Sequence, residues 1–138
     1  MRYLIAIILL LSPALSDRQA KGSRMKIELD VFSGRPNPTW ILNDEEAKEF
    51  LAKFKALTAS DSDKPLYDGL GYRGFKATGF QDYDKVTVRQ GIVEARRGGK
   101  TYRWRDQGKH LEKYLLKLAK AHVDEGIYKI VASSIDKN

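Results

Sequence analysis

The sequence predicts an α+β domain in which an antiparallel sheet of about four to six strands packs against two amphipathic helices. Three observations predict this class. Short apolar runs alternate with polar residues at a period of two, which is typical of half-buried strands. Glycine-containing turns separate the last of these runs at the spacing of hairpins. Two longer segments, 43–58 and 108–124, carry apolar residues at helical spacing.

Length and composition limit the function classes. A chain of 138 residues suits one domain with a single core. The absence of cysteine excludes disulfides, thiolate catalysis and cysteine-ligated metals. The chain has 25 Lys and Arg against 18 Asp and Glu, a net charge of +7. This basic balance favours polyanionic partners such as nucleic acid, anionic lipid or acidic cell-wall polymers.

Residues 1–16 have the layout of a secretory signal peptide, with Arg2, an apolar run at 4–11, and small residues Ala14 and Ser16 before the cleavage point. The run is shorter than the roughly 20 residues that span a bilayer. We therefore expect a signal peptide at 1–16, a polar linker at 17–24, and a secreted or periplasmic domain at 25–138 that does not span the membrane after cleavage. Two alternatives are an uncleaved anchor and a true start at Met25, which would make the protein cytosolic.

The domain begins with two predicted strands and a helix. Residues 27–31 alternate apolar and polar, residues 33–38 form a turn cluster, and residues 39–42 form a second short strand. Asn43 can then cap the first helix, with Glu46 completing a capping box.

For the middle of the chain, the sequence predicts a loop followed by a β-meander, in which consecutive antiparallel strands are joined by tight turns. Residues 61–84 are rich in turn residues, with one short strand at 72–78. Three further strands follow, joined by two glycine turns: 85–89, 92–96 and 101–105.

The second helix ends the predicted core. It runs from 108 to 124, and Gly126 is placed as its C′ residue. Residues 127–135 are apolar enough for a final strand or a packed tail, and periodicity leaves helix and strand open there. The expected core residues are Ile27, Leu29, Val31, Phe50, Leu51, Phe54, Val86, Val88, Val93, Trp104, Leu111, Leu115 and Leu118.

The loop at residues 33–40 is the first candidate binding site. Its two prolines restrict the backbone, so it should present Arg35 and Asn37 rigidly with Trp40 at its base. A planar guanidinium beside an aromatic ring suits recognition of a carboxylate, a phosphate or a carbohydrate. The alternative is a rigid connection in which Arg35 pairs with Asp30 or Asp44.

Two strings also carry a resemblance. Asp-Val-Phe-Ser-Gly-Arg-Pro-Asn-Pro at 30–38, followed by Trp40 and by Leu-Gly-Tyr-Arg-Gly-Phe at 70–75, resembles a group of small uncharacterised exported proteins. The resemblance implies no activity. It implies that the two segments belong together, so that Tyr72 and Arg73 would join the 33–40 loop in one site.

A basic sheet face is the second candidate site. Alternation along the meander places four arginines on one face: Arg89, Arg96, Arg103 and Arg105. Such a face could bind phosphates without reading bases. The alternatives are a solvated face relieved by Glu94 and a face covered by a helix.

Catalytic and metal chemistry has weaker signals. His110 and His122 lie on one predicted helix, roughly 18 Å apart along its axis, so they cannot share one metal. A secreted ribonuclease could use His110 with Glu94 or Glu112 as a general acid and base. Acidic pairs at 61–63 and 82–84 lack the EF-hand pattern, so no metal site and no cofactor are expected.

These observations favour a small exported binding module without catalytic residues, which recognises an anionic or carbohydrate group through the 33–40 loop. An anionic polymer, a glycan or another protein could be its partner. Two alternatives stay open: a secreted hydrolase that uses His110 and a glutamate, and an inhibitor or immunity-type partner of another secreted protein.

Overall fold

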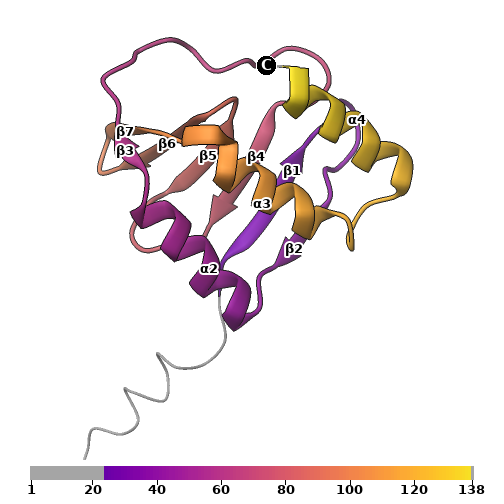
Figure 1. The fold of residues 1–138 in the computed structure, drawn as a ribbon, viewed down its shortest axis with the longest axis horizontal. Coiled ribbons are helices and arrows are strands. Elements are labelled where there is room, and N and C mark those ends of the chain that lie inside the picture. Colours follow the sequence, from indigo (N-terminus) through magenta and orange to yellow (C-terminus); the bar gives the residue numbers. More distant parts are fainter. Residues whose placement is uncertain (1–23, 138) are drawn as a thin grey trace, which may run out of the picture.

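The fold is an open antiparallel sheet with helices on one face, seen in a computed structural model that describes residues 24–137 (Figure 1). The sheet has seven strands in the order β2-β1-β4-β5-β6-β7-β3. The elements are β1 (Lys26–Asp30), β2 (Thr39–Ile41), α2 (Asp44–Lys55), β3 (Thr58–Ala59), β4 (Gly74–Thr78), β5 (Lys85–Arg89), β6 (Ile92–Arg97), β7 (Lys100–Arg105), the 3₁₀ turn η1 (Gln107–Lys109), α3 (His110–Ala119) and α4 (Glu125–Lys137). This confirms the predicted α+β class, with more strands than expected and a third helix within the described residues.

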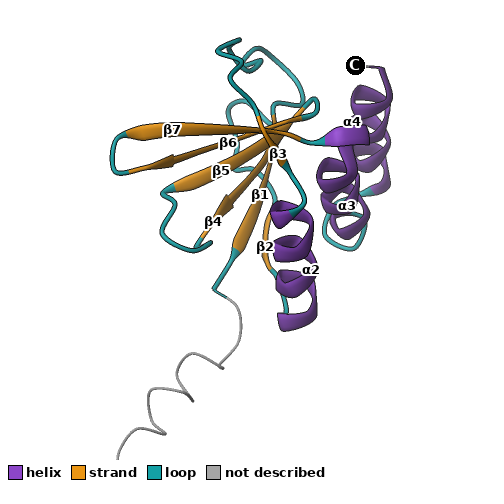
Figure 2. Ribbon diagram, turned by 60° about the vertical axis from the view of Figure 1, so that its left-hand side comes forward, coloured by secondary structure: helices purple, strands orange, loops and turns teal. Residues whose placement is uncertain are grey.

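The three helices share one side of the sheet, and no helix of residues 24–137 lies over the other side, which we call the helix-free side (Figure 2). Buried residues of alternating strand positions, such as Ile27, Leu29, Val86 and Val88, face the helices. The expected core is confirmed for the most part. Leu51, Trp104 and Leu118 are only partly buried, although all three pack against it.

Local sequence explains the first helix and the central hairpin. The Asn43 side chain accepts from the Glu46 amide at 2.8 Å, and the Glu46 side chain accepts from the Asn43 amide at 2.9 Å, which is the predicted capping box. Gln90 and Gly91 join β5 to β6 with φ angles of 53° and 77°. Two successive positive φ angles are typical of the tight turn whose twist matches a hairpin.

The C-terminal part corrects the sequence prediction. α3 ends at Ala119, and Asp124 accepts from the Ile127 amide at 2.9 Å at the start of α4. Gly126 therefore lies in the first turn of a new helix and is not a C′ residue. The segment 127–135 is helical because Val131 and Ile135, one turn apart, are both buried against the core.

The segment between β3 and β4, residues 60–73, contains no helix or strand. Loops longer than about 12–15 residues without regular structure are uncommon in compact domains and are often functional. β3 pairs with β7 at one edge of the sheet, whereas β4 lies between β1 and β5. The 60–73 loop therefore returns the chain from the sheet edge to its centre, past the ends of the strands (Figure 1).

Gly74, the first residue of β4, should not tolerate a side chain. Its φ is +113°, and an added Cβ would lie 2.7 Å from the Val88 carbonyl oxygen. We expect Gly74→Ala to lower the free energy of unfolding in urea by about 2–4 kcal/mol. The control is Gly98→Ala, where φ is also positive but nothing lies within 4 Å, so only about 1 kcal/mol should be lost. Equal losses would contradict a steric role for Gly74.

Candidate functional site

The two sequence motifs meet at the buried carboxylate of Asp30. Asp30 ends β1 on the helix-free side of the sheet, and its side chain is only 7% exposed. Its Oδ1 accepts from Arg73 Nη2 at 2.7 Å and Nε at 3.1 Å, while its Oδ2 pairs with Lys76 Nζ at 2.7 Å. The Arg73 amide also donates to the Asp30 carbonyl oxygen at 2.7 Å. Two segments that are distant in sequence are thus joined by one ionic cluster.

Asn37 holds the other end of this cluster. Its Oδ1 accepts from the Val31 amide at 3.0 Å and the Phe32 amide at 2.7 Å. Its Nδ2 donates to Glu28 Oε2 at 2.8 Å and to Asp30 Oδ1 at 3.1 Å. Asn37 therefore closes the loop after β1 on itself, and its amide has no free hydrogen-bonding edge for a ligand.

The N–H donors of the Arg73 guanidinium are also engaged by groups of the protein. Beyond Asp30, it donates from Nη2 to the Phe32 carbonyl oxygen at 2.6 Å. Its Nη1 donates to the carbonyl oxygens of Gly69 at 2.9 Å and Gly71 at 3.2 Å. The guanidinium therefore ties the 60–73 loop to the turn after β1, and its donors are directed at the protein itself.

The five predicted binding residues do not share one surface. Asn37 and Arg73 meet at Asp30 on the helix-free side. Arg35 is exposed and lies over the Phe32 ring, 3.7 Å from its centroid. Trp40 and Tyr72 are buried in the core on the side of the helices, where Trp40 stacks on His122 with centroids 4.8 Å apart.

Tyr72 belongs to a buried polar group that sequence reasoning missed. Its hydroxyl donates to Glu112 Oε2 at 2.6 Å, and Glu112 is completely buried on α3. The guanidinium carbon of Arg89 lies 4.7 Å from the centroid of the Tyr72 ring. A cation over an aromatic face contributes up to about 2 kcal/mol when it is desolvated.

Burial dominates the electrostatics of this group. It raises the pKa of Glu112, against the opposing influence of the Tyr72 hydroxyl, the Gln90 and Gly91 amides and the Arg89 charge. Burial and the neighbouring Glu112 charge raise the pKa of Tyr72, so its hydroxyl stays protonated and donates. The burial of Glu112 has a signal in the sequence: Glu112 lies three residues before Leu115 and seven before Ala119, and so on the buried face of the helix.

The four arginines of the predicted basic face have different surroundings. Arg103 pairs with Glu94 at 2.5 Å and also donates to the carbonyl oxygens of Ser62 and Lys64 in the 60–73 loop. Arg89 is buried, whereas Arg96 and Arg105 are exposed. The arginines therefore do not form one uniform cationic face.

A groove of about 390 Å³ lies on the helix-free side, between the 60–73 loop and the strands. Lys85 and Arg96 face each other directly across β5 and β6 in its lining. Among the described residues neither has an ion-pair partner. Like charges directly opposite each other destabilise a sheet. Thr87, two residues after Lys85 on the same face of β5, also lines the groove.

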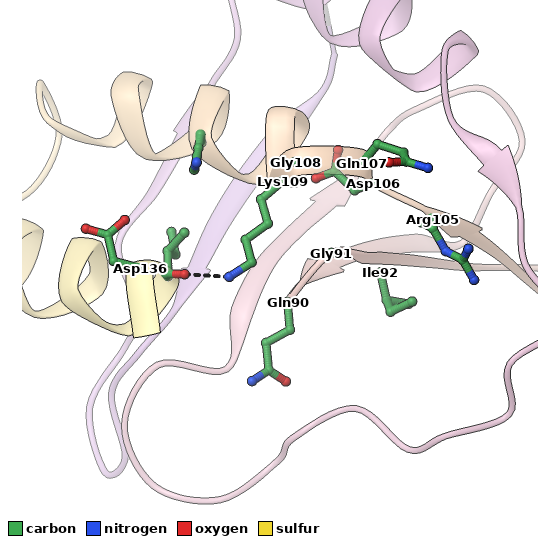
Figure 3. A pocket seen from close by; sticks show the side chains of 11 residues that line it. Gln90, Gly91, Ile92, Arg105, Asp106, Gln107, Gly108, Lys109 and Asp136 are labelled. Atoms are coloured by element: carbon green, nitrogen blue, oxygen red, sulfur yellow. Dashed lines mark hydrogen bonds between the residues drawn. The ribbon is translucent and has the colours of Figure 1, made fainter. Parts of the chain in front are cut away.

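A second pocket, of about 510 Å³, opens beside the hairpin turn of β5 and β6 (Figure 3). Two of its polar side chains, Lys109 and Asp106, are engaged within the protein. Lys109 extends across it to donate to the Ile135 carbonyl oxygen at 2.7 Å. Asp106 accepts from the Leu111 and Glu112 amides at 3.0 Å each, which caps the N-terminus of α3.

The predicted hydrolase residues are not assembled. His110 is exposed at the start of α3 and lines a separate pocket with Leu57 and Asp106. Glu94 lies on the helix-free side with Arg103, and Glu112 is buried against Tyr72. Over residues 24–137, no group of three or more His, Cys, Asp or Glu side chains could hold a metal ion. None of the helices in that same range is long and apolar enough to cross a bilayer.

No protein-family model, curated protein or solved structure matches this chain. The resemblance carried by residues 30–38 and 70–75 therefore stays a prediction.

Replacing Asp30 tests the ionic cluster. Asp30→Asn would leave Arg73 and Lys76 without their shared counter-charge, and we expect the free energy of unfolding to fall by about 2–4 kcal/mol in urea denaturation. The control is Asp82→Asn, which removes an exposed pair with Arg97 and should change stability little. A similar loss in both variants would show that Asp30 has no special role.

The cluster should also make stability depend on acid pH. Burial acts to raise the pKa of Asp30, but hydrogen bonds and charges from Arg73 and Lys76 outweigh it, so the pKa lies below its ordinary value of 3.8. A lowered folded-state pKa stabilises the fold above the unfolded value and loses this contribution as the pH falls through the folded value. The stability difference between wild type and Asp30→Asn should therefore be constant near neutral pH and shrink below about pH 4. Urea unfolding of both proteins across that range checks this, and a difference that grows in acid would contradict it.

Proposed function

We propose that this protein is an exported binding module that holds an acidic glycan in the groove on the helix-free side of its sheet. The observation that carries the proposal is the pair formed by Lys85 and Arg96, which are directly opposite, both exposed, and without ion-pair partners among the described residues. Such a pair is unfavourable in the free protein, and a bound anion would relieve the repulsion.

The rest of the groove suits a sugar that carries charge. Thr87 supplies a hydroxyl, and Glu94 and Asp68 supply carboxylates that can accept from sugar hydroxyls. Tyr67 adds a half-exposed aromatic ring at the loop side. Mixed polar groups around an aromatic ring are typical of ligand sites in which a few polar contacts fix the orientation.

The Asp30 cluster supports this function by keeping the groove in place. Asp30, Arg73 and Lys76 line the same groove, but their charges are directed at one another. The motif residues predicted as ligand contacts thus act in this proposal as positioning residues, and Lys85 and Arg96 are the ligand contacts. The 33–40 loop is joined to the Asp30 cluster through Asn37, whose Nδ2 donates to Asp30 Oδ1.

An extracytoplasmic role is part of the proposal. The signal-peptide pattern at residues 1–16 supports it, although that segment lies outside the described residues. The net charge of +7 is consistent with a ligand or surface of negative charge. The geometry does not favour the hydrolase alternative, because Glu94 pairs with Arg103 on the helix-free side and Glu112 is buried against Tyr72, whereas His110 is exposed at the start of α3.

Lys85→Gln tests the groove with two readouts of opposite sign. We expect its affinity for a heparin tetrasaccharide, measured by calorimetry, to fall about 3- to 10-fold because one cationic contact is lost. We expect its stability in urea to rise by a few tenths of a kcal/mol, since the like-charge pair with Arg96 is removed.

The matched control is Lys117→Gln, an exposed residue of α3 on the other side of the sheet, which changes the net charge equally. If both variants lose affinity equally, binding depends only on net charge, and this result would contradict a specific binding site in the groove. A chitin tetrasaccharide of the same length should bind far more weakly, because it offers no anion to the two cations.

A further inference from the structure

Arg89 differs from the other arginines that lie along the sheet. Arg73, Arg97 and Arg103 each have a carboxylate oxygen within 3.1 Å. Arg89 exposes only 4% of its surface, yet its Nε and Nη1 are buried without a hydrogen bond among the described residues. An arginine cannot shed its proton in a protein, so this is a buried charge whose donors are unused.

The fold makes room for this side chain in a specific way. Arg89 ends β5 and faces the helix-free side, next to Gly74 of the neighbouring strand β4. A Cβ on Gly74 would lie 3.1 Å from Arg89 Cβ and 3.5 Å from Cδ, so the glycine lets the arginine stem pass. The guanidinium carbon then lies 4.7 Å from the Tyr72 ring centroid and 5.6 Å from that of Tyr67. The two rings hold the guanidinium plane but use none of its N–H donors.

No carboxylate of the protein completes the arrangement. Glu112 is close enough for the charge of Arg89 to influence it, but no ion pair joins the two. Glu112 instead accepts from the Tyr72 hydroxyl. A buried charge without a hydrogen-bonded partner is costly, and a ligand anion beside the guanidinium would compensate that charge.

Arg89 lines a pocket of about 450 Å³ between the 60–73 loop and the β5–β6 turn. Lys64 is the second cation of this pocket, and no carboxylate lines it. Pro65, Leu66 and Ile92 give its remaining wall an apolar character. The pocket therefore combines two cationic side chains with an apolar wall, unlike the mixed-charge groove lined by Lys85 and Arg96.

We propose that this pocket binds a small organic carboxylate, with the carboxylate between Arg89 and Lys64 and an apolar body against Pro65, Leu66 and Ile92. Because Nε and Nη1 are buried, the carboxylate would meet the guanidinium on its Nη2 side, where a charge-assisted hydrogen bond can form. This site is separate from the glycan groove of the proposed function and does not require it.

The probe is hexanoate, titrated into the full-length protein labelled with ¹⁵N and followed by NMR. We expect saturable shifts of the Arg89 Nε–H and of the Gln90 and Ile92 amides, with a Kd on the order of 1 mM for so small a molecule. 1-Hexanol has the apolar body without the charge, and inorganic phosphate has charge without the body. Both should bind at least several-fold more weakly. Equal binding of hexanol would overturn the role of the charge, and equal binding of phosphate would overturn the role of the apolar wall.

Arg89→Met keeps the length of the stem and removes the charge, and we expect it to weaken hexanoate binding at least tenfold. The matched control is Arg105→Met, an exposed arginine directly opposite Ile92 that does not line this pocket, and its affinity should stay within twofold. If Arg89→Met does not fold, Lys64→Met and Arg89→Lys serve instead, and each should weaken binding several-fold.

The thermal stability of the ligand-free variants separates a binding role from a purely structural one. Removing the buried charge relieves its desolvation penalty, and this gain offsets the lost cation–π contacts with Tyr72 and Tyr67, so the melting temperature of Arg89→Met should stay unchanged or rise. A clear drop, together with unchanged hexanoate affinity, would assign Arg89 to the fold alone and overturn the proposal. Lys85→Gln should leave hexanoate binding unaltered, so the pocket and the glycan groove can fail independently.

Discussion

The ion pairs and hydrogen bonds of the Asp30 carboxylate hold the segments on the helix-free side of the molecule together. It joins β1 to Arg73 and Lys76 and, through Asn37, to the turn that follows β1. Because Arg73 is held there, its remaining donors fix the Gly69 and Gly71 carbonyl groups and so one end of the 60–73 loop. Tyr72, the preceding residue, is directed to the opposite side, where it meets Glu112. Gly74 follows at once and opens the path for Arg89. One buried carboxylate thereby orders the residues from 69 to 74 and the arginine beside them.

The cations fall into two groups: those paired within the protein, which hold the fold together, and those without such partners, which are candidate ligand contacts. A cation that already meets a carboxylate and backbone carbonyl groups gains little from an outside anion. Arg73 and Arg103 are of this kind, since their donors hold the 60–73 loop. Lys85, Arg96 and Arg89 have no such partners among the described residues, and they line the groove and the pocket that this loop borders. The uncompensated cations therefore mark the candidate binding sites, which the overall basic charge of the chain alone would not locate.

The elements governed by local sequence could be predicted, and those governed by distant contacts could not. The Asn43 capping box and the glycine turn at Gly91 depend on neighbouring residues, so the pattern alone revealed them. Alternation placed Asp30 on the exposed side of β1, but it could not show that Arg73 would bury it from another segment. The helix over 127–135 was ambiguous because isoleucine and valine also favour strands, and only its packing against the core settled the matter. The predicted site failed to converge for the same reason: Trp40 and Tyr72 follow the sheet's alternation to the core side, whereas Asn37 and Arg73 lie on the other.

The 60–73 loop connects the two candidate sites physically. At one end Arg103 donates to the carbonyl oxygens of Ser62 and Lys64. At the other end Arg73, itself a loop residue, donates to Asp30 and to the Phe32 carbonyl oxygen. Segments held by side chains, without strand pairing, open locally at lower free energy than the sheet beneath them. Leu66 lines both the groove and the Arg89 pocket, so a shift of this part of the loop changes the shape of both. A ligand that orders the loop in one site therefore alters the conformational cost of binding in the other, and the sign of that coupling depends on whether both ligands require the same loop position.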